Sequence, residues 1–157
     1  MTETTDEALG RIDRTIEVNA PLDRVWRILT TAKDLSTWFK VDIEGEIAAG
    51  AEVWMISKYP GYEGKRFLVR VTEMTPPRRF AWQWHPGAVD DDIDYTREAW
   101  TTVTFTLEPS GAGTRLSVSE TGFNEVSLAR RAKVFKDNSQ GWAAVIVWIQ
   151  KYAEAQG

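Results

Sequence analysis

The stretch GWAAVIVWIQKY, residues 141–152, decides the fold. Its apolar side chains recur at helical spacing and predict an amphipathic helix with a wide apolar stripe, formed by Trp142, Val145, Ile146, Ile149 and Tyr152. The residues before this helix read mainly as short strands. A single long helix that follows a meander of strands can bury such a stripe only by lying across the concave face of the sheet. We therefore expect a cavity between helix and sheet.

Composition narrows the class of protein. A chain of 157 residues fits one domain, so we expect a flexible N-terminal arm over residues 1–10 and a single domain over 11–157. The absence of cysteine excludes disulfides and thiolate chemistry. The net charge is −4 with Lys and Arg scattered, so we expect no nucleic-acid partner. The polar, acidic start of the chain and the lack of a long apolar run predict a cytoplasmic protein without a membrane span.

The first half of the domain combines one strand with a pair of helices. Alternation of Ile12, Ile16 and Val18 with polar residues predicts a strand, to which Arg14 is the exception. Helical spacing from Leu22 to Leu29 after Pro21 predicts a short helix. Thr31 is expected to cap a second helix that buries Leu35, Trp38 and Phe39.

Gly and Pro divide the rest of the chain into strand-sized pieces, at 42–47, 51–58, 66–74, 79–85, 99–108 and 114–121. Their short links imply antiparallel neighbours. The long acidic loop over 86–98 is expected near a cavity mouth. Helical residues 127–136 are expected to fray at 137–139, and the terminal helix then runs to about Ala155, with a kink or break near Gly141.

Alternation within the strands assigns their faces. One parity forms the expected concave wall, namely Phe67, Val69, Val71, Phe80, Trp82, Trp84, Val103, Phe105, Leu107, Leu116 and Val118. The other parity is rich in Thr and Ser, which is typical of a sheet with one face in water. In 51–58 both parities are apolar, so Trp54 and Met55 have no assigned face.

Several short motifs in this order resemble one family, namely Ala20-Pro21 with Val25-Trp26, Leu35 with Trp38-Phe39, Pro76-Pro77-Arg78-Arg79-Phe80, Thr114-Arg115-Leu116, Glu120-Thr121-Gly122-Phe123 and Gly141-Trp142. The chain resembles the helix-grip domains of the START-like (SRPBCC) superfamily, in the branch of the C-terminal domain of the Hsp90 ATPase activator. The resemblance implies an α+β helix-grip fold with a seven-stranded curved antiparallel sheet, two short helices and one long C-terminal helix. It also implies an apolar tunnel, which relatives use for lipids, polyketides, plant hormones or antibiotics. The large N-terminal domain of Hsp90 co-chaperones has no counterpart here, so we do not expect Hsp90 as a partner.

A ligand-binding site is predicted along this wall and the facing helix, formed by Phe67, Val69, Trp82, Trp84, Tyr95, Phe105, Glu120, Trp142, Ile146 and Ile149. The competing interpretation is a fully packed core. Glu120 continues the inward parity, where it would accept from a ligand, act as a general base, or only pair with an Arg or cap a turn. His85 is expected at the surface or strand end. No metal site, cofactor or catalytic residue is predicted, because the acidic loop lacks the pattern of a calcium site and no phosphate-binding motif occurs.

Binding of a hydrophobic or aromatic, lipid- or polyketide-like small molecule is the leading functional hypothesis, because apolar lining is abundant while acids, bases and nucleophiles are scarce. The alternative is an enzyme of the polyketide cyclase or dehydratase type that uses the same cavity, with Glu120 as its base. The resemblance alone adds two further hypotheses, an antibiotic-sequestering protein and an Hsp90-activator-like regulator. The residues do not specify an oligomeric state.

Overall fold

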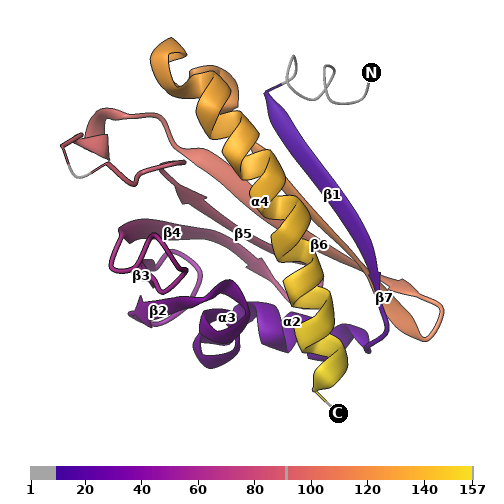
Figure 1. Ribbon diagram of the computed structural model, residues 1–157. Helices are drawn as coiled ribbons and strands as arrows, with labels where there is room; N and C mark the ends of the chain where they lie inside the picture. The colour runs from indigo at the N-terminus through magenta and orange to yellow at the C-terminus, as the bar shows by residue number, and fades with distance from the viewer. Residues whose placement is uncertain (1–9, 91, 157) are drawn as a thin grey trace.

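The computed structural model describes residues 10–90 and 92–156, and within these residues seven strands form one antiparallel sheet with the helices on one of its faces (Figure 1). The elements are β1 (Arg11–Val18), α2 (Leu22–Thr30), α3 (Ala32–Phe39), β2 (Val41–Glu44), β3 (Glu52–Ser57), β4 (Arg66–Thr75), β5 (Arg79–Trp84), the 3-10 turn η1 (Tyr95–Arg97), β6 (Thr101–Ser110), β7 (Gly113–Thr121), the 3-10 turn η2 (Phe123–Glu125) and α4 (Leu128–Ala155). The strand order is β1-β7-β6-β5-β4-β3-β2. The predicted helix-grip architecture is confirmed. The arm predicted over residues 1–10 lies outside the described residues except for Gly10, whose carbonyl accepts from the amide of Phe123.

The core lies between the concave face of the sheet and the helices. The side chains of β4 to β7 that were predicted to face inward are buried, apart from those of Phe67 and Trp84, which are only half-buried. In β3, Met55 is buried at 2% exposure while Trp54 is 39% exposed. This strand therefore turns Met55 toward the core and Trp54 toward the outer face, where the Arg66 guanidinium lies 5.1 Å from its ring centroid.

Two local predictions were wrong. Thr31 occupies the N-cap position of α3, but its hydroxyl donates to the Arg27 carbonyl at 2.6 Å, because α2 ends directly before it and leaves that carbonyl near the threonine. The strand predicted over 42–47 ends at Glu44, because Gly45 turns the chain with a φ of 115°.

The predicted fraying and break of the C-terminal helix are also wrong, since α4 is a continuous helix of 28 residues. The polar residues expected to end it have partners elsewhere in the fold. Asn138 donates to the Glu120 carboxylate at 3.0 Å, and Ser139 accepts from Arg14 at 2.6 Å. These bonds leave the helix backbone intact and explain why Arg14 breaks the alternation of β1.

Gly141 lies in the interior of α4 and is exposed, and a methyl group added there would have no atom within 4 Å beyond the helix itself. Gly141→Ala is therefore expected to raise the free energy of unfolding by about 0.5–1 kcal/mol, because alanine loses less backbone entropy in a helix. Urea denaturation measures this change. Gly61→Ala is the control, because Gly61 also lies in open space but has a φ of 94°, which disfavours alanine. A loss of stability in Gly141→Ala would contradict an unbroken helix.

Helix α4 lies along β1 and packs against α2 and α3 (Figure 1). Near its C-terminal end, Gln150 donates to the Glu17 carbonyl at 2.8 Å and Glu154 accepts from the Asn19 amide at 2.8 Å. The Tyr152 hydroxyl donates to Asp34 of α3 at 2.6 Å. These bonds hold α4 over the β1 side of the sheet, so α3 and the loops cover the side formed by β3 to β5.

Candidate ligand-binding site

An aromatic cluster fills the space between β5, β6, α3 and α4. Its rings are those of Phe39, Phe80, Trp82, Trp84, Phe105 and Trp142, with neighbouring centroids 5.3–6.2 Å apart. Phe39 stacks on both Trp84 and Trp142 at 6.1 Å. Such contacts add to the burial energy of the rings.

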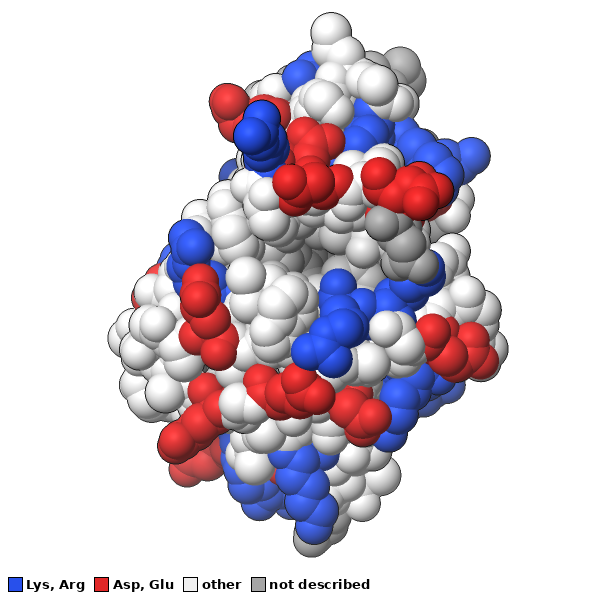
Figure 2. Space-filling view, turned by 90° about the vertical axis from the view of Figure 1, so that its left-hand side faces the viewer, with Lys and Arg blue, Asp and Glu red and all other residues white. Residues whose placement is uncertain are grey.

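The rings of this cluster differ in how deeply they are buried. Phe80, Trp82 and Phe105 are at most 1% exposed, whereas Phe39 and Trp84 are half-buried. Phe67 of β4 is also half-buried and lies 6.3 Å from Trp84. Figure 2 shows a hollow on the side of the molecule that carries the loops after β3 and after β5. The half-buried rings of Phe39, Phe67 and Trp84 are neighbours, with Trp84 between the other two.

The loop between β3 and β4 is held against α3 and α4 by stacked rings. Tyr59 stacks on Trp148 of α4 with centroids 5.9 Å apart. The Lys40 ammonium, at the end of α3, lies 3.9 Å from the Trp148 centroid. This cation–π contact and the stacked rings hold the loop to the helix.

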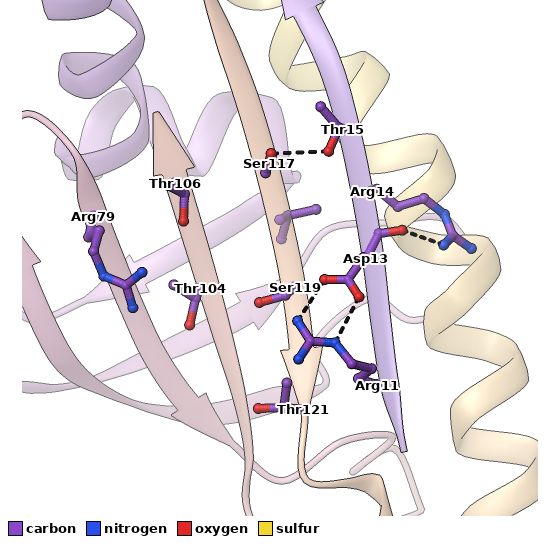
Figure 3. Close-up of a pocket in the computed structure, with 11 residues that line it drawn as sticks. Arg11, Asp13, Arg14, Thr15, Arg79, Thr104, Thr106, Ser117, Ser119 and Thr121 are labelled. Atoms are coloured by element: carbon purple, nitrogen blue, oxygen red, sulfur yellow. Dashed lines mark hydrogen bonds and ion pairs between the residues drawn. The ribbon is translucent and has the colours of Figure 1, made fainter. Parts of the chain in front are cut away.

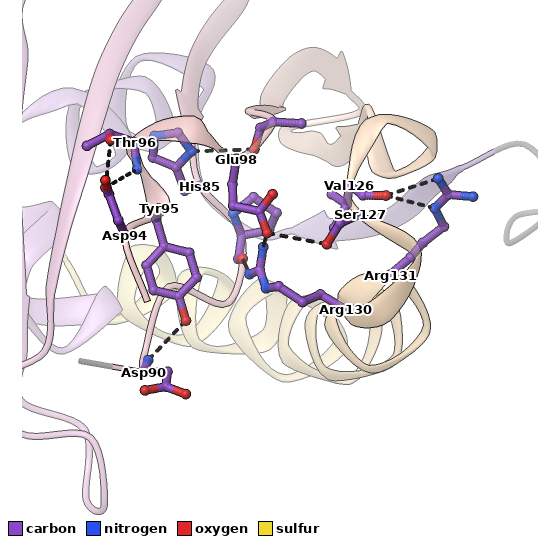
Figure 4. A network of polar contacts seen from close by, with 12 residues as sticks. His85, Asp90, Asp94, Tyr95, Thr96, Glu98, Val126, Ser127, Arg130 and Arg131 are labelled. Atoms are coloured by element: carbon purple, nitrogen blue, oxygen red, sulfur yellow. Dashed lines mark hydrogen bonds and ion pairs between the residues drawn. The ribbon is translucent and has the colours of Figure 1, made fainter. Parts of the chain in front are cut away.

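The loop between β5 and β6 is held to the first turns of α4 by Arg130 (Figure 4). Its guanidinium donates to Glu98 at 2.9 Å and to the Pro86 carbonyl, and lies 4.8 Å from the centroid of Tyr95. His85, at the start of this loop, packs against a neighbouring indole, and burial lowers its pKa below the usual value. His85 thus lies at a strand end, as predicted.

Glu120 of β7 is fully buried beneath the cluster. One carboxylate oxygen accepts from the Trp142 indole at 2.8 Å, and the other accepts from the Trp84 indole at 2.9 Å and from the Thr101 hydroxyl. The Asn138 amide donates to both oxygens at 3.0 and 3.2 Å. Burial raises the pKa of Glu120, while these four neutral donors act in the opposite direction. Four donors fill the acceptor capacity of a carboxylate, so Glu120 orients the two indoles.

The Trp82 indole nitrogen is the one buried side-chain N or O atom of the described residues without a hydrogen-bond partner. Leaving such a donor unpaired costs about 1–3 kcal/mol. The aromatic cluster therefore holds one unused polar group.

A second depression lies on the outer face of the sheet (Figure 3), with a volume of about 410 Å³. Polar side chains line it, namely Arg11, Asp13, Arg14, Thr15, Arg79, Thr104, Thr106, Ser117, Ser119 and Thr121, together with Val118. Arg11 is already paired with Asp13 at 2.8 Å. Hydroxyls and paired charges do not suit an apolar ligand. The described residues contain no cluster of His, Cys, Asp and Glu suited to a metal, and no helix among them has the length and apolarity to cross a bilayer.

The predicted site residues fall into three groups. Phe67 and Trp84 are half-buried and lie next to each other, and Tyr95 lies in the loop that Arg130 holds. The others are buried in the core, namely Val69, Trp82, Phe105, Glu120, Trp142, Ile146 and Ile149. Phe39 was expected only as part of the buried side of the second helix. Its position at the end of that helix, next to Lys40, was the one sign in the sequence that its ring lies near the surface.

A curved seven-stranded antiparallel sheet gripping a long C-terminal helix defines a helix-grip domain of the START-like superfamily. The model of the family described as Activator of Hsp90 ATPase homolog 1-like protein matches residues 19–154, so the chain belongs to this family. No curated protein sequence matches the chain.

Solved structures share the fold at low sequence identity. A protein of Mesorhizobium loti is 18% identical with a TM-score of 0.75, over 94% of this chain and 98% of that chain. The Aha1 dimer of Colwellia psychrerythraea is 19% identical with a TM-score of 0.69, over 94% and 98%. DynU16, a protein of the dynemicin biosynthetic locus, is 19% identical with a TM-score of 0.69, over 93% of this chain and 48% of that chain. At this identity the likeness concerns the fold alone.

Proposed function

We propose that this protein binds a hydrophobic, aromatic small molecule in the hollow bordered by Phe39, Phe67 and Trp84. The observation that carries the proposal is the incomplete burial of these three rings on the helix-covered side of the sheet, where the neighbouring rings are fully packed. A ligand that covers aromatic faces inside a concave surface removes apolar area from water, which favours binding. The likeness to DynU16, a protein of the dynemicin biosynthetic locus, supports the same class of function.

Binding is favoured over acid–base catalysis by the state of Glu120. A general base needs a free lone pair within hydrogen-bond reach of the substrate. The carboxylate of Glu120 is instead enclosed by Trp84, Thr101, Asn138 and Trp142. The chain therefore supplies a shaped aromatic surface, while its strongest candidate base is engaged in holding that surface.

Titration with the neutral fluorescent probe N-phenyl-1-naphthylamine tests the proposal. Trp84→Ala is expected to weaken binding by about tenfold or more, because it removes a ring face from the wall. Trp54→Ala is the matched control, since Trp54 is a half-exposed tryptophan on the opposite face of the sheet, and it should leave the affinity unchanged. Equal losses in both variants, or no binding to the unaltered protein, would overturn the proposal. Native mass spectrometry of the purified protein then reports any co-purified ligand.

A further inference from the structure

Glu120 is the one fully buried charged side chain among the described residues. Its four partners, Trp84, Thr101, Asn138 and Trp142, are all neutral, and no Lys or Arg of the described part of the chain pairs with it. An indole N–H can only donate, and each carboxylate oxygen accepts from one indole. Because all four partners donate, the arrangement suits the ionised form, while burial raises the pKa of this carboxyl; above that raised pKa the core holds a negative charge without a counter-charge.

The indole of Trp84 connects this charge to the hollow. Its nitrogen donates to Glu120 at 2.9 Å, while its ring is half-buried and stacks on Phe39. Donation to a carboxylate polarises the indole, and this raises the electron density on its ring face. The surroundings are apolar, so the field of the carboxylate is weakly screened there.

We infer that Glu120 determines the class of ligand, favouring through Trp84 an aromatic molecule that carries a positive charge. The inference rests on the proposed function, because it concerns the same hollow. A cation over an indole face is attracted by the ring, most strongly where water is excluded. Acidic and basic side chains both border the hollow at the surface (Figure 2), where water and salt screen them. Glu120 is thus a specificity-determining residue that acts without touching the ligand.

Two probes of nearly identical shape isolate the charge. N-methylquinolinium is a cation, and 1-methylnaphthalene is its neutral counterpart. We expect the unaltered protein to bind the cation more tightly, and Glu120→Gln to lower the ratio of the two affinities by about tenfold. NMR titration of the indole N–H signals measures both affinities and reports whether the variant is folded. Glu125→Gln is the matched control, because it removes an exposed carboxylate and should leave the ratio unchanged.

Trp84→Phe provides a second variant that keeps Glu120 and an aromatic face but removes the hydrogen bond between them. It should also lower the preference for the cation. An unchanged ratio in Glu120→Gln and in Trp84→Phe, with both probes bound, overturns the inference and leaves the proposed function standing. A lack of binding by both probes to the unaltered protein overturns the two together.

Discussion

Glu120→Leu is expected to lower the free energy of unfolding by about 2–5 kcal/mol, because Trp84 and Trp142 both lose the acceptor of their buried indole N–H. Leucine is close to glutamate in volume, so the change removes hydrogen bonds with little cavity. Thr101 and Asn138 can turn their polar groups, but an indole cannot. Urea denaturation at fixed pH measures the loss. Glu46→Leu, at an exposed position, is the control and should change stability little.

The same variant has a distinct pH dependence. Burial raises the pKa of Glu120 in the folded protein above its usual value, so the folded state keeps this proton at a higher pH than the unfolded chain does. Its contribution to stability is therefore fully present below the usual pKa and is lost as the pH rises through the raised pKa. Glu17, Glu73 and Asp94 have lowered pKa values and act in the opposite sense in both proteins.

The difference in stability between the unaltered protein and Glu120→Leu isolates the contribution of Glu120. It should be largest at acidic pH and shrink as the pH rises through this window. Denaturation curves collected across the pH range provide the comparison. Parallel pH profiles for the two proteins would show that the carboxyl group titrates equally in both states, contrary to its burial.

Gly113→Ala is expected to cost about 3 kcal/mol of stability. A methyl group at this position would lie 2.4 Å from the backbone oxygen of Val18, which the pairing of β1 with β7 holds in place. The next residue adds a second constraint, since the buried Thr114 hydroxyl donates to the Ala20 carbonyl at 2.8 Å. Neither β1 nor β7 can move away from the added methyl group without breaking their pairing or this hydrogen bond.

Gly111→Asn is the matched control in the same hairpin. Gly111 has a φ of 58° and open space around it, and asparagine tolerates this left-handed conformation. The free energy of unfolding of the Gly111→Asn variant should stay within about 0.5 kcal/mol of that of the unaltered protein. Urea denaturation compares the two variants, and similar effects at both positions would contradict a specific close approach at Gly113.

Local periodicity was sufficient to predict the seven strands apart from their ends, the helix pair and the inward direction of Glu120. Local periodicity did not predict that the C-terminal helix continues through Asn138 and Ser139, because the composition there indicated a break. Their partners, Glu120 and Arg14, are distant in the chain, and only the folded arrangement brings them together. For the same reason the sequence could not show that Glu120 is enclosed by donors.

The sequence predicted on which face of the sheet the site residues lie, but not how deeply each of them is buried. Alternation places Trp82 and Trp84 on the same side of β5, yet one is fully packed and the other half-buried. Trp82 lies inside β5 and packs against Phe80 and Phe105, whereas Trp84 is the last residue of the strand, a difference that alternation does not show. Tyr95 depends equally on a tertiary contact, its packing against Arg130.

The position of β1 at one edge of the sheet has a consequence for how the chain folds. Among the described residues its one neighbour in the sheet is β7, so its ladder forms only after residues up to Thr121 have been synthesised, and α4 packs on it later still. Contacts between segments so distant in sequence slow folding, because a long loop must close before any of them forms. We therefore expect the nascent chain to remain without a completed sheet until the ribosome has passed β7.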